Sequence, residues 1–273
     1  MNKSFAVLTS AICALFVPGS SASAAPLRQP LKNWVVDWGD TVCTASLAYG
    51  SEKAPIMLAL RPSPNGTMVR LLVARSGRAL LAHHFPVTTS ITSEQEKTTG
   101  LRFGSSKKKS EIIWISFNRS SLEALKGAGE IAVTAKGIVD ERFALPGMSA
   151  VLKALDECNQ DLRVHWNVGA AADTQLTKRA TSLKPLPSHF SDADYPHQAL
   201  QENASGATRV MMMIDETGAM KDCMVEETSG IATLDAMTCS VLQQRAKFNP
   251  ALDSAGKPTR SVLTSTIKWM MPQ

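Results

Sequence analysis

The sequence of 273 residues lacks the short motifs that mark most enzyme active sites and metal centres. It contains no G-x-S-x-G nucleophile turn, no H-E-x-x-H zinc motif and no glycine-rich loop that could hold a phosphate. No two cysteines have C-x-x-C spacing, and no histidine lies at ligand spacing from a cysteine. We therefore predict a protein that is not an enzyme, with no catalytic residue, metal site or cofactor.

The histidines do not change this prediction. His83 and His84 are neighbours in a predicted strand, where adjacent side chains point to opposite faces, so they cannot share one metal ion. His189 and His197 flank two aspartates, but Asp194 between them is better explained as a helix cap. We interpret these residues as ordinary surface or structural positions.

The sequence also lacks a strong charge imbalance and, after its first 25 residues, any apolar stretch long enough to cross a membrane. Twenty-nine basic residues against 24 acidic ones give a formal net charge of +5, spread along the chain. A nucleic-acid-binding protein gathers more positive charge on one face. We therefore predict no nucleic-acid partner.

Residues 1–24 have the pattern of a signal peptide. Lys3 gives a positive start, and the apolar run from Phe5 to Val17 would span about 20 Å as a helix, too short for a hydrocarbon core of about 30 Å. The small residues 22–24 follow where a signal peptidase cleaves. We predict cleavage after Ala24, export to the bacterial periplasm and no stable membrane span afterwards. The alternatives are an uncleaved anchor and a lipoprotein at Cys13.

The remaining cysteines suggest disulfides, because their number is even and the chain is predicted to be exported. Four cysteines allow three pairings. One bridge per predicted domain favours Cys43–Cys158 and Cys223–Cys239. Four buried thiols are the alternative interpretation.

The sequence predicts an α+β protein whose N-terminal domain, residues 26–168, is rich in strands and has a late helix. Apolar residues alternate or cluster in short runs bounded by turn residues, which is typical of strands. The predicted strands are 56–60, 69–73, 111–117, 131–135, 138–143 and 163–168. Short helices are predicted from Ser120 to Lys126 and from a cap at Ser149 through Cys158.

This domain contains three distinctive segments, which are Trp34-x-Val36-x-Trp38, Cys43-Thr-Ala-Ser46 and the stretch from Phe143 to Leu155. Together they resemble the invasion-associated locus B family. The resemblance implies a β-rich domain in the cell envelope and no known chemistry. Residues 169–187, rich in Ala, Thr, Ser and Pro, are predicted to link this domain to the next.

Residues 188–273 are predicted to fold in the order helix, strand, strand, helix, strand. The first helix follows Asp194, the strands cover 208–215, 220–226 and 261–270, and the second helix follows a cap at Thr233. Alternation along 208–215 puts Met212 on the core face and leaves Met211 and Met213 outside. The pair Cys223–Cys239 would tie the second strand to the second helix.

Several short motifs occur in a fixed order along this region: Tyr195-Pro196, Gly206, Asp215-x-x-Gly218, Ser229-Gly230, Leu234-Asp235, Phe248-Asn249-Pro250-Ala251, Gly256-x-Pro258 and Trp269. Their order and spacing resemble the TonB C-terminal domain family. The resemblance implies an α-β-β-α-β fold that binds an extended segment of an outer-membrane transporter at a sheet edge. The physical basis of such binding is the row of unpaired N–H and C=O groups on an edge strand.

We predict that the last strand is this edge, with the partner-binding residues Val262, Thr264, Thr266, Lys268 and Trp269. The predicted function is therefore a periplasmic TonB-like module that binds an envelope protein or peptide, such as a TonB-dependent outer-membrane transporter. The sequence has no long Pro-Lys spacer, so we expect binding and not force transmission. The alternative is an exported structural or host-interaction protein whose N-terminal domain carries the binding.

Overall fold

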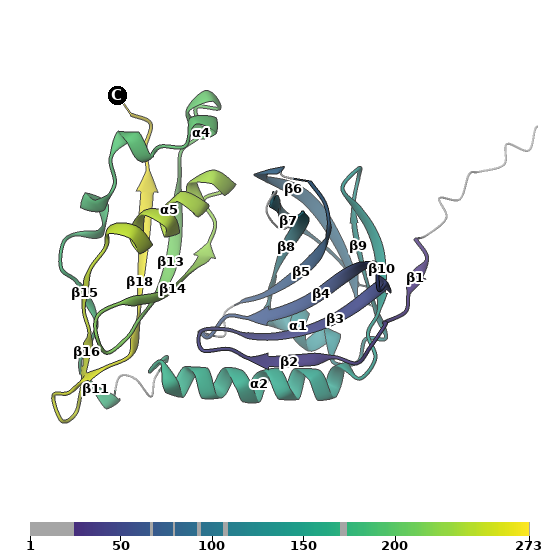
Figure 1. Ribbon diagram of the computed structural model, residues 1–273, viewed down its shortest axis with the longest axis horizontal. Helices are drawn as coiled ribbons and strands as arrows, with labels where there is room; N and C mark the ends of the chain where they lie inside the picture. The colour runs from purple at the N-terminus through teal and green to yellow at the C-terminus, as the bar shows by residue number, and fades with distance from the viewer. Residues whose placement is uncertain are drawn as a thin grey trace, which may run out of the picture.

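The computed structural model describes residues 25–65, 68–78, 80–91, 94–105, 109–169 and 174–272. The signal peptide predicted for residues 1–24 lies outside these ranges. Within them the chain forms two units, a large curved sheet with two helices and a smaller α+β unit (Figure 1). The fold class predicted from the sequence is confirmed.

A ten-stranded sheet makes up most of the N-terminal domain. Its neighbours are paired in the order β1-β10-β9-β6-β7-β8-β5-β4-β3-β2. All neighbouring strands are antiparallel except β1 and β10. The strand bounds are β1 Leu27–Arg28, β2 Val35–Trp38, β3 Cys43–Ser51, β4 Ala54–Pro62, β5 Met68–Ser76, β6 Leu80–Ile91, β7 Glu94–Ser105, β8 Ser110–Asn118, β9 Glu130–Ala135 and β10 Val139–Ala144.

The sheet curls until its two ends meet, as the ribbon in Figure 1 shows. Pro30, just after β1, bridges to Tyr49 of β3, so the segment 27–30 contacts both β10 and β3, which lie near opposite ends of the strand order. The Tyr49 hydroxyl donates a 2.7 Å hydrogen bond to the carbonyl oxygen of Ala144 at the end of β10. Alternate side chains of each strand point inward and form one buried core.

Helices α1 (Arg119–Leu125) and α2 (Met148–His165) contribute to this core. The predicted cap at Ser149 is wrong, because Gly147 is the N-cap and has the positive φ of 68° that glycine tolerates. The predicted strand at 163–168 is also wrong, because α2 continues through His165. Leu162 is buried and prolongs the helical spacing of Leu155 and Cys158 by one more turn.

The predicted linker contains two short strands that pair with the C-terminal domain. β11 (Leu176–Lys178) pairs with β16 (Ala251–Asp253), and β12 (Thr181–Ser182) pairs with β15 (Phe248–Asn249). The 3₁₀ helix η1 (Leu186–His189) follows and places Leu186 in the core of the C-terminal domain. Residues 174–189 therefore belong structurally to that domain.

The C-terminal domain is a three-stranded antiparallel sheet with one long helix on it. The strands are ordered β14-β13-β18, and helix α5 packs against β13 and β14. The bounds of its remaining elements are η2 Asp192–Asp194, α4 His197–Gln201, β13 Gly206–Ile214, β14 Met220–Glu227, α5 Ala232–Arg245, β17 Pro258–Thr259 and β18 Ser261–Trp269. The predicted cap at Thr233 is wrong, because Ile231 is the N-cap and Thr233 lies two positions later, inside the helix.

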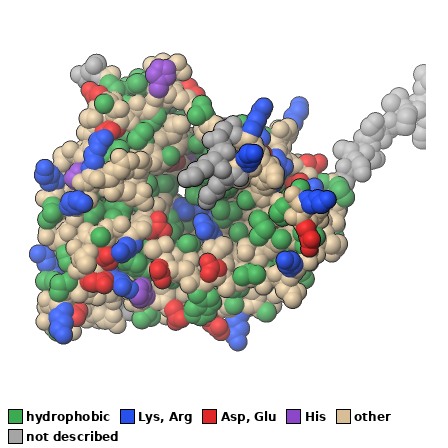
Figure 2. All heavy atoms as spheres, in the orientation of Figure 1, with side chains coloured by type: hydrophobic (Ala, Val, Ile, Leu, Met, Phe, Trp, Pro, Cys, Tyr) green, Lys and Arg blue, Asp and Glu red, His purple; other side chains and the backbone are tan. Residues whose placement is uncertain are grey.

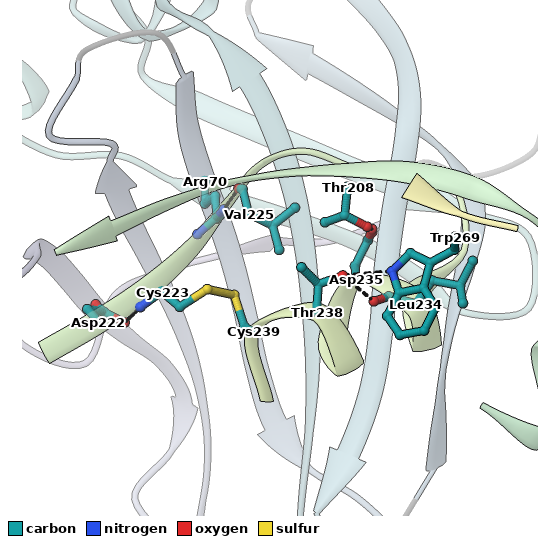
Figure 3. Close-up of a disulfide and its surroundings, with 10 residues drawn as sticks. All are labelled: Arg70, Thr208, Asp222, Cys223, Val225, Leu234, Asp235, Thr238, Cys239 and Trp269. Atoms are coloured by element: carbon teal, nitrogen blue, oxygen red, sulfur yellow. Dashed lines mark hydrogen bonds between the residues drawn. A yellow bond between two sulfur atoms is a disulfide. The ribbon is translucent and has the colours of Figure 1, made fainter. Parts of the chain in front are cut away.

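Both predicted disulfides are present. Cys43 of β3 bonds to Cys158 of α2, and Cys223 of β14 bonds to Cys239 of α5. Each bridge lies within one domain and ties a strand to a helix, so the two bridges have the same arrangement. Figure 3 shows the second bridge at the surface where the two domains meet.

The central strand β13 is buried on both faces from Val210 to Ile214. Val210, Met212 and Ile214 pack under α5 in the core of that domain. Met211 and Met213, predicted to lie outside, are fully buried instead, in the same apolar cluster as the core of the N-terminal domain. The sequence prediction was wrong because it allowed for one core face only.

Candidate functional site

Strand β18 forms one edge of the C-terminal sheet. It pairs along its whole length with β13, from Ser261 opposite Ile214 to Trp269 opposite Gly206. Among the described residues, no strand pairs with its other side. Nine consecutive residues without proline therefore present alternate backbone N–H and C=O groups away from the sheet.

The opposite edge, β14, is held by other parts of the chain. The Arg70 side chain of β5 donates a hydrogen bond to the carbonyl oxygen of Val225, and Asn65 donates one to Glu226 (Figure 3 shows the first). The Cys223–Cys239 bridge fixes the same strand to α5. Of the two edges, β18 is therefore the one left open.

The side chains of β18 form two rows. Val262, Thr264, Thr266 and Lys268 share the face of Met211, because Thr264 lies directly opposite it. Thr264, Thr266 and Lys268 are exposed, whereas Val262 is half-buried against the N-terminal domain. The structure thus brings the first four predicted residues together on one face of the edge strand.

Trp269, the fifth predicted residue, has its side chain on the other face. It is 5% exposed, and its Nε1 donates a 2.8 Å hydrogen bond to Thr238 Oγ1 of α5. The rings of Phe190 and Tyr195 meet it edge-on, with centroids 5.2 and 5.5 Å away. Such edge-to-face packing is favourable for aromatic rings. The indole anchors the end of β18 to the core, and only the Trp269 backbone lies at the open edge.

Asp235 holds the sheet and helix α5 together (Figure 3). Its buried carboxylate accepts hydrogen bonds from Thr208 Oγ1 at 2.7 Å, from the Ser229 N–H at 2.8 Å and from the Thr228 hydroxyl. Nε2 of His84, from the N-terminal domain, lies 3.8 Å from the same carboxylate. Burial alone would raise the pKa of Asp235, but these donors together hold it below its ordinary value.

The turn between β13 and β14 is fixed by Asp215. Its Oδ1 accepts hydrogen bonds from the Thr217 N–H, the Thr217 hydroxyl and the Ala219 N–H, at 2.6 to 2.9 Å. Burial opposes ionisation, yet these donors and Lys221 lower the pKa of Asp215 to about 2. Gly218 ends the turn with φ 81°, where a Cβ atom would lie 2.3 Å from the carbonyl oxygen of Phe248. Asp215 and Gly218 therefore both have structural roles.

The prediction that Asp194 caps helix α4 is wrong, because Pro196 is the N-cap of that helix and Asp194 ends η2. Its carboxylate accepts bonds from both terminal nitrogens of Arg245, at 2.6 and 2.7 Å, and from the Ser191 N–H. The Arg245 hydrogen bond, which outweighs the effect of burial, holds the pKa of Asp194 well below its usual range. This pair joins the start of the domain to the end of α5.

The contacts between the domains were missed by the sequence analysis. Nδ2 of Asn167 donates a 2.7 Å hydrogen bond to the carbonyl oxygen of Arg260, and the Arg260 guanidinium lies 5.8 Å from the Trp166 ring centroid. Arg260 also pairs with Glu216 at 2.8 Å. The signal for these contacts in the sequence is the apolar run Met211-Met212-Met213. An apolar run within a strand is typical of a strand that is buried on both faces.

The described residues contain no group of three or more His, Cys, Asp and Glu side chains placed to hold a metal ion. Nor do they contain a helix that is both long and apolar enough to span a membrane.

Residues 191–271 match the family model described as Gram-negative bacterial TonB protein C-terminal. This match confirms the resemblance drawn from the motif residues. Searches of curated proteins and of solved structures found no match. The TonB C-terminal family is a periplasmic domain family associated with envelope transport, not an enzyme family.

Proposed function

We propose that this TonB C-terminal domain binds an extended segment of an outer-membrane transporter in the periplasm, which adds as a fourth strand beside β18. The observation that supports the proposal is the open edge of a nine-residue strand in a domain of this family. Strand addition draws its affinity from backbone hydrogen bonds and its specificity from alternate side chains. Thr264, Thr266 and Lys268 provide those side chains.

The composition of this edge also suits reversible binding. Threonine favours extended backbone, and an exposed lysine on an edge strand discourages pairing with a second copy of the same strand. Trp269 and Ser261 are buried and fix both ends of β18. A partner would therefore meet a strand that is already ordered, and little ordering entropy would oppose binding.

A second candidate function places the binding surface on the N-terminal domain. Strand β2 is an edge of the large sheet, and it exposes 60% of Val35 and 52% of Trp38. Exposed apolar side chains on an edge strand are typical of an interaction surface. This arrangement suits an exported structural or host-interaction protein whose first domain binds the partner.

Photo-cross-linking in cells distinguishes the two candidates. A photoreactive amino acid is placed at Thr264 or Thr266 on the β18 edge, at Val35 on the β2 edge, and at Gln243 on the exposed face of α5 as a control. We expect cross-links to an outer-membrane transporter from 264 and 266, and none from 35 or 243. Cross-links from Val35 alone would transfer the binding function to the N-terminal domain.

A further inference from the structure

A large cavity lies between the outer face of the barrel-like sheet and the C-terminal domain. Its volume is about 870 Å³, within the range of cavities that bind small organic molecules. Strands β5 to β8 form one wall, and β14 with the start of α5 forms the other. Figure 2 shows the molecule hollowed between its two halves, with hydrophobic and basic side chains around the hollow.

The strand pattern shows that this cavity is distinct from the core of the N-terminal domain. Val69, Leu71 and Val73 of β5 point into that core, whereas Met68 and Arg70 line the cavity. Likewise Ile113 and Ile115 of β8 point inward, and Trp114 lines the cavity. An outward face would ordinarily carry polar side chains.

This outward face is instead largely apolar. The apolar side chains around the cavity are Met68, Leu80, Leu81, Ala82, Leu101, Phe103, Trp114, Met224, Val225, Ala232 and Ala236. Leu81 is 76% exposed, which places an apolar side chain at the rim of the cavity. The Cys223–Cys239 bridge forms part of the opposite wall. The walls therefore suit an apolar ligand that enters past Leu81.

One cation on the wall has no carboxylate partner within salt-bridge distance among the described residues. Arg70 can donate five hydrogen bonds, but in the described chain it donates one, to the Val225 carbonyl oxygen. Its guanidinium also lies 5.2 Å from the centroid of the Trp114 ring. Burial lowers the pKa of Arg70, and the charges of Asp222 and Glu226 offset only part of that effect. Glu226 is engaged by Asn65 and Arg209.

Two further polar atoms at the cavity lack a protein partner. Nε1 of Trp114 and Nδ1 of His84 are buried, and neither has a hydrogen bond within the described structure. The two residues lie in one cross-strand row, because His84 is opposite Leu101 and Leu101 is opposite Trp114. A buried donor without an acceptor is unfavourable unless a ligand supplies the acceptor. The Trp114 N–H and the Arg70 guanidinium lie close together. Both are hydrogen-bond donors, so they favour an anionic oxygen as their acceptor.

We propose that this cavity binds the anion of a fatty acid such as dodecanoate, with the carboxylate on Arg70 and Trp114 Nε1 and the alkyl chain along Leu101, Phe103 and Met224. Arg70 supplies the charge and the geometry for a carboxylate. The apolar walls supply the affinity for the alkyl chain, because each CH₂ group buried there is removed from water. The proposal does not depend on strand addition at β18, which lies on the other edge of the sheet.

The test is isothermal titration of the purified full chain with dodecanoate, with dodecanol as a neutral competitor of the same length. We expect one dodecanoate per chain and weaker binding of dodecanol. In Arg70→Met, which keeps an apolar stem, dodecanoate affinity should fall at least tenfold while dodecanol affinity changes little. Ala236→Phe, on the exposed face of α5 at the cavity, should abolish binding of both.

The matched control is Gln243→Phe, which adds the same ring to the same helix away from the cavity. It should bind dodecanoate as the unmodified chain does, and the melting temperatures of all variants should show that each is folded. The proposal is overturned if dodecanoate does not bind saturably, or if Ala236→Phe and Arg70→Met bind as tightly as Gln243→Phe. It is also overturned if native mass spectrometry of the purified chain shows a peptide held in place of dodecanoate.

Discussion

At the scale of single residues, buried polar side chains hold the C-terminal domain together. Asp235, Asp215 and Asp194 each accept several hydrogen bonds, and each joins segments that are distant in the sequence or fixes a tight turn. Buried acceptors of this kind are costly to remove, because their donors are left unpaired. Asp215 and Asp235, two of the residues that carry the family resemblance, therefore have structural roles.

Replacing Asp235 by alanine should destabilise the C-terminal domain by about 3 kcal/mol, because Thr208 Oγ1 and the Ser229 N–H lose their acceptor. Asp235→Asn keeps Oδ1 for both donors and should cost clearly less. Asp192→Ala, at an exposed position, is the control and should lie within about 0.5 kcal/mol of the unmodified chain. Urea unfolding measures all three. Equal losses for the alanine and asparagine variants would contradict the assigned hydrogen bonds.

Acid should weaken the β13–β14 turn through Asp215. Its folded pKa of about 2 lies below the ordinary value of 3.8, so ionised Asp215 stabilises the fold above pH 4. That contribution is lost as the pH falls from about 4 to 2, where the carboxyl becomes protonated in the folded state. The melting temperature of Asp215→Asn should therefore fall less over this range than that of the unmodified chain. Glu52→Gln, at an exposed site, should follow the unmodified chain, and identical slopes for all three would refute the assignment.

At the scale of elements, the two disulfides differ in the length of chain they close. Cys43–Cys158 spans 115 residues and Cys223–Cys239 spans 16. In the chain-entropy model the longer loop contributes about 4.7 kcal/mol and the shorter about 3 kcal/mol. Paired serine variants, compared by denaturant unfolding, should show the larger loss for Cys43 and Cys158. A larger loss for Cys223 and Cys239 would mean that the shorter bridge acts through native packing instead.

A proline scan of β18 should give an alternating result. Backbone N–H groups of successive strand residues point to opposite sides, so Thr264→Pro and Thr266→Pro should behave alike and Ser265→Pro oppositely. The class whose N–H groups face β13 should lower stability by about 1–3 kcal/mol, because a β13 carbonyl oxygen loses its donor. Proline at a position whose N–H faces outward should leave the melting temperature unchanged and abolish partner binding. Loss of binding that tracks stability at all three positions would argue against an open edge.

The elements themselves were largely predictable, because alternation and turn residues are local signals. Strands 208–215, 220–226 and 261–270 were placed within two residues at every boundary of β13, β14 and β18. The segment 163–168 was wrongly predicted as a strand, because a short apolar run fits a strand or a helix end equally well. The faces of Met211 and Met213 and the cavity beside Trp114 could not be read from the sequence. Both depend on which surfaces of two domains meet.

At the scale of the whole molecule, the N-terminal domain covers one face of the C-terminal sheet. Met211, Met213 and Met224 are buried in the cluster of that domain, and Asn167 and Arg70 reach across to backbone carbonyls. The N-terminal domain therefore contacts strand β14 of this sheet through side chains, whereas β18 keeps an edge with no pairing strand among the described residues. Separating the domains should affect the β14 side first.

Two fragments test this arrangement. A fragment of residues 174–273 keeps β11 and β12 paired with β16 and β15, and it should be more stable than one of residues 188–273. Both fragments should expose the three methionines and bind an apolar dye that the full chain does not bind. Thermal unfolding and dye fluorescence make the comparison. Equal stability of the two fragments would show that residues 174–187 do not support the C-terminal domain.

The most direct measurement is backbone amide hydrogen exchange along β18, in the free protein and with the cross-linked transporter segment bound. In the free protein, alternate amides between Ser261 and Trp269 should exchange quickly, because they face away from β13. With the segment bound, those same amides should become protected while the others stay as they were. Protection confined to β14, or no change along β18, would contradict strand addition at this edge.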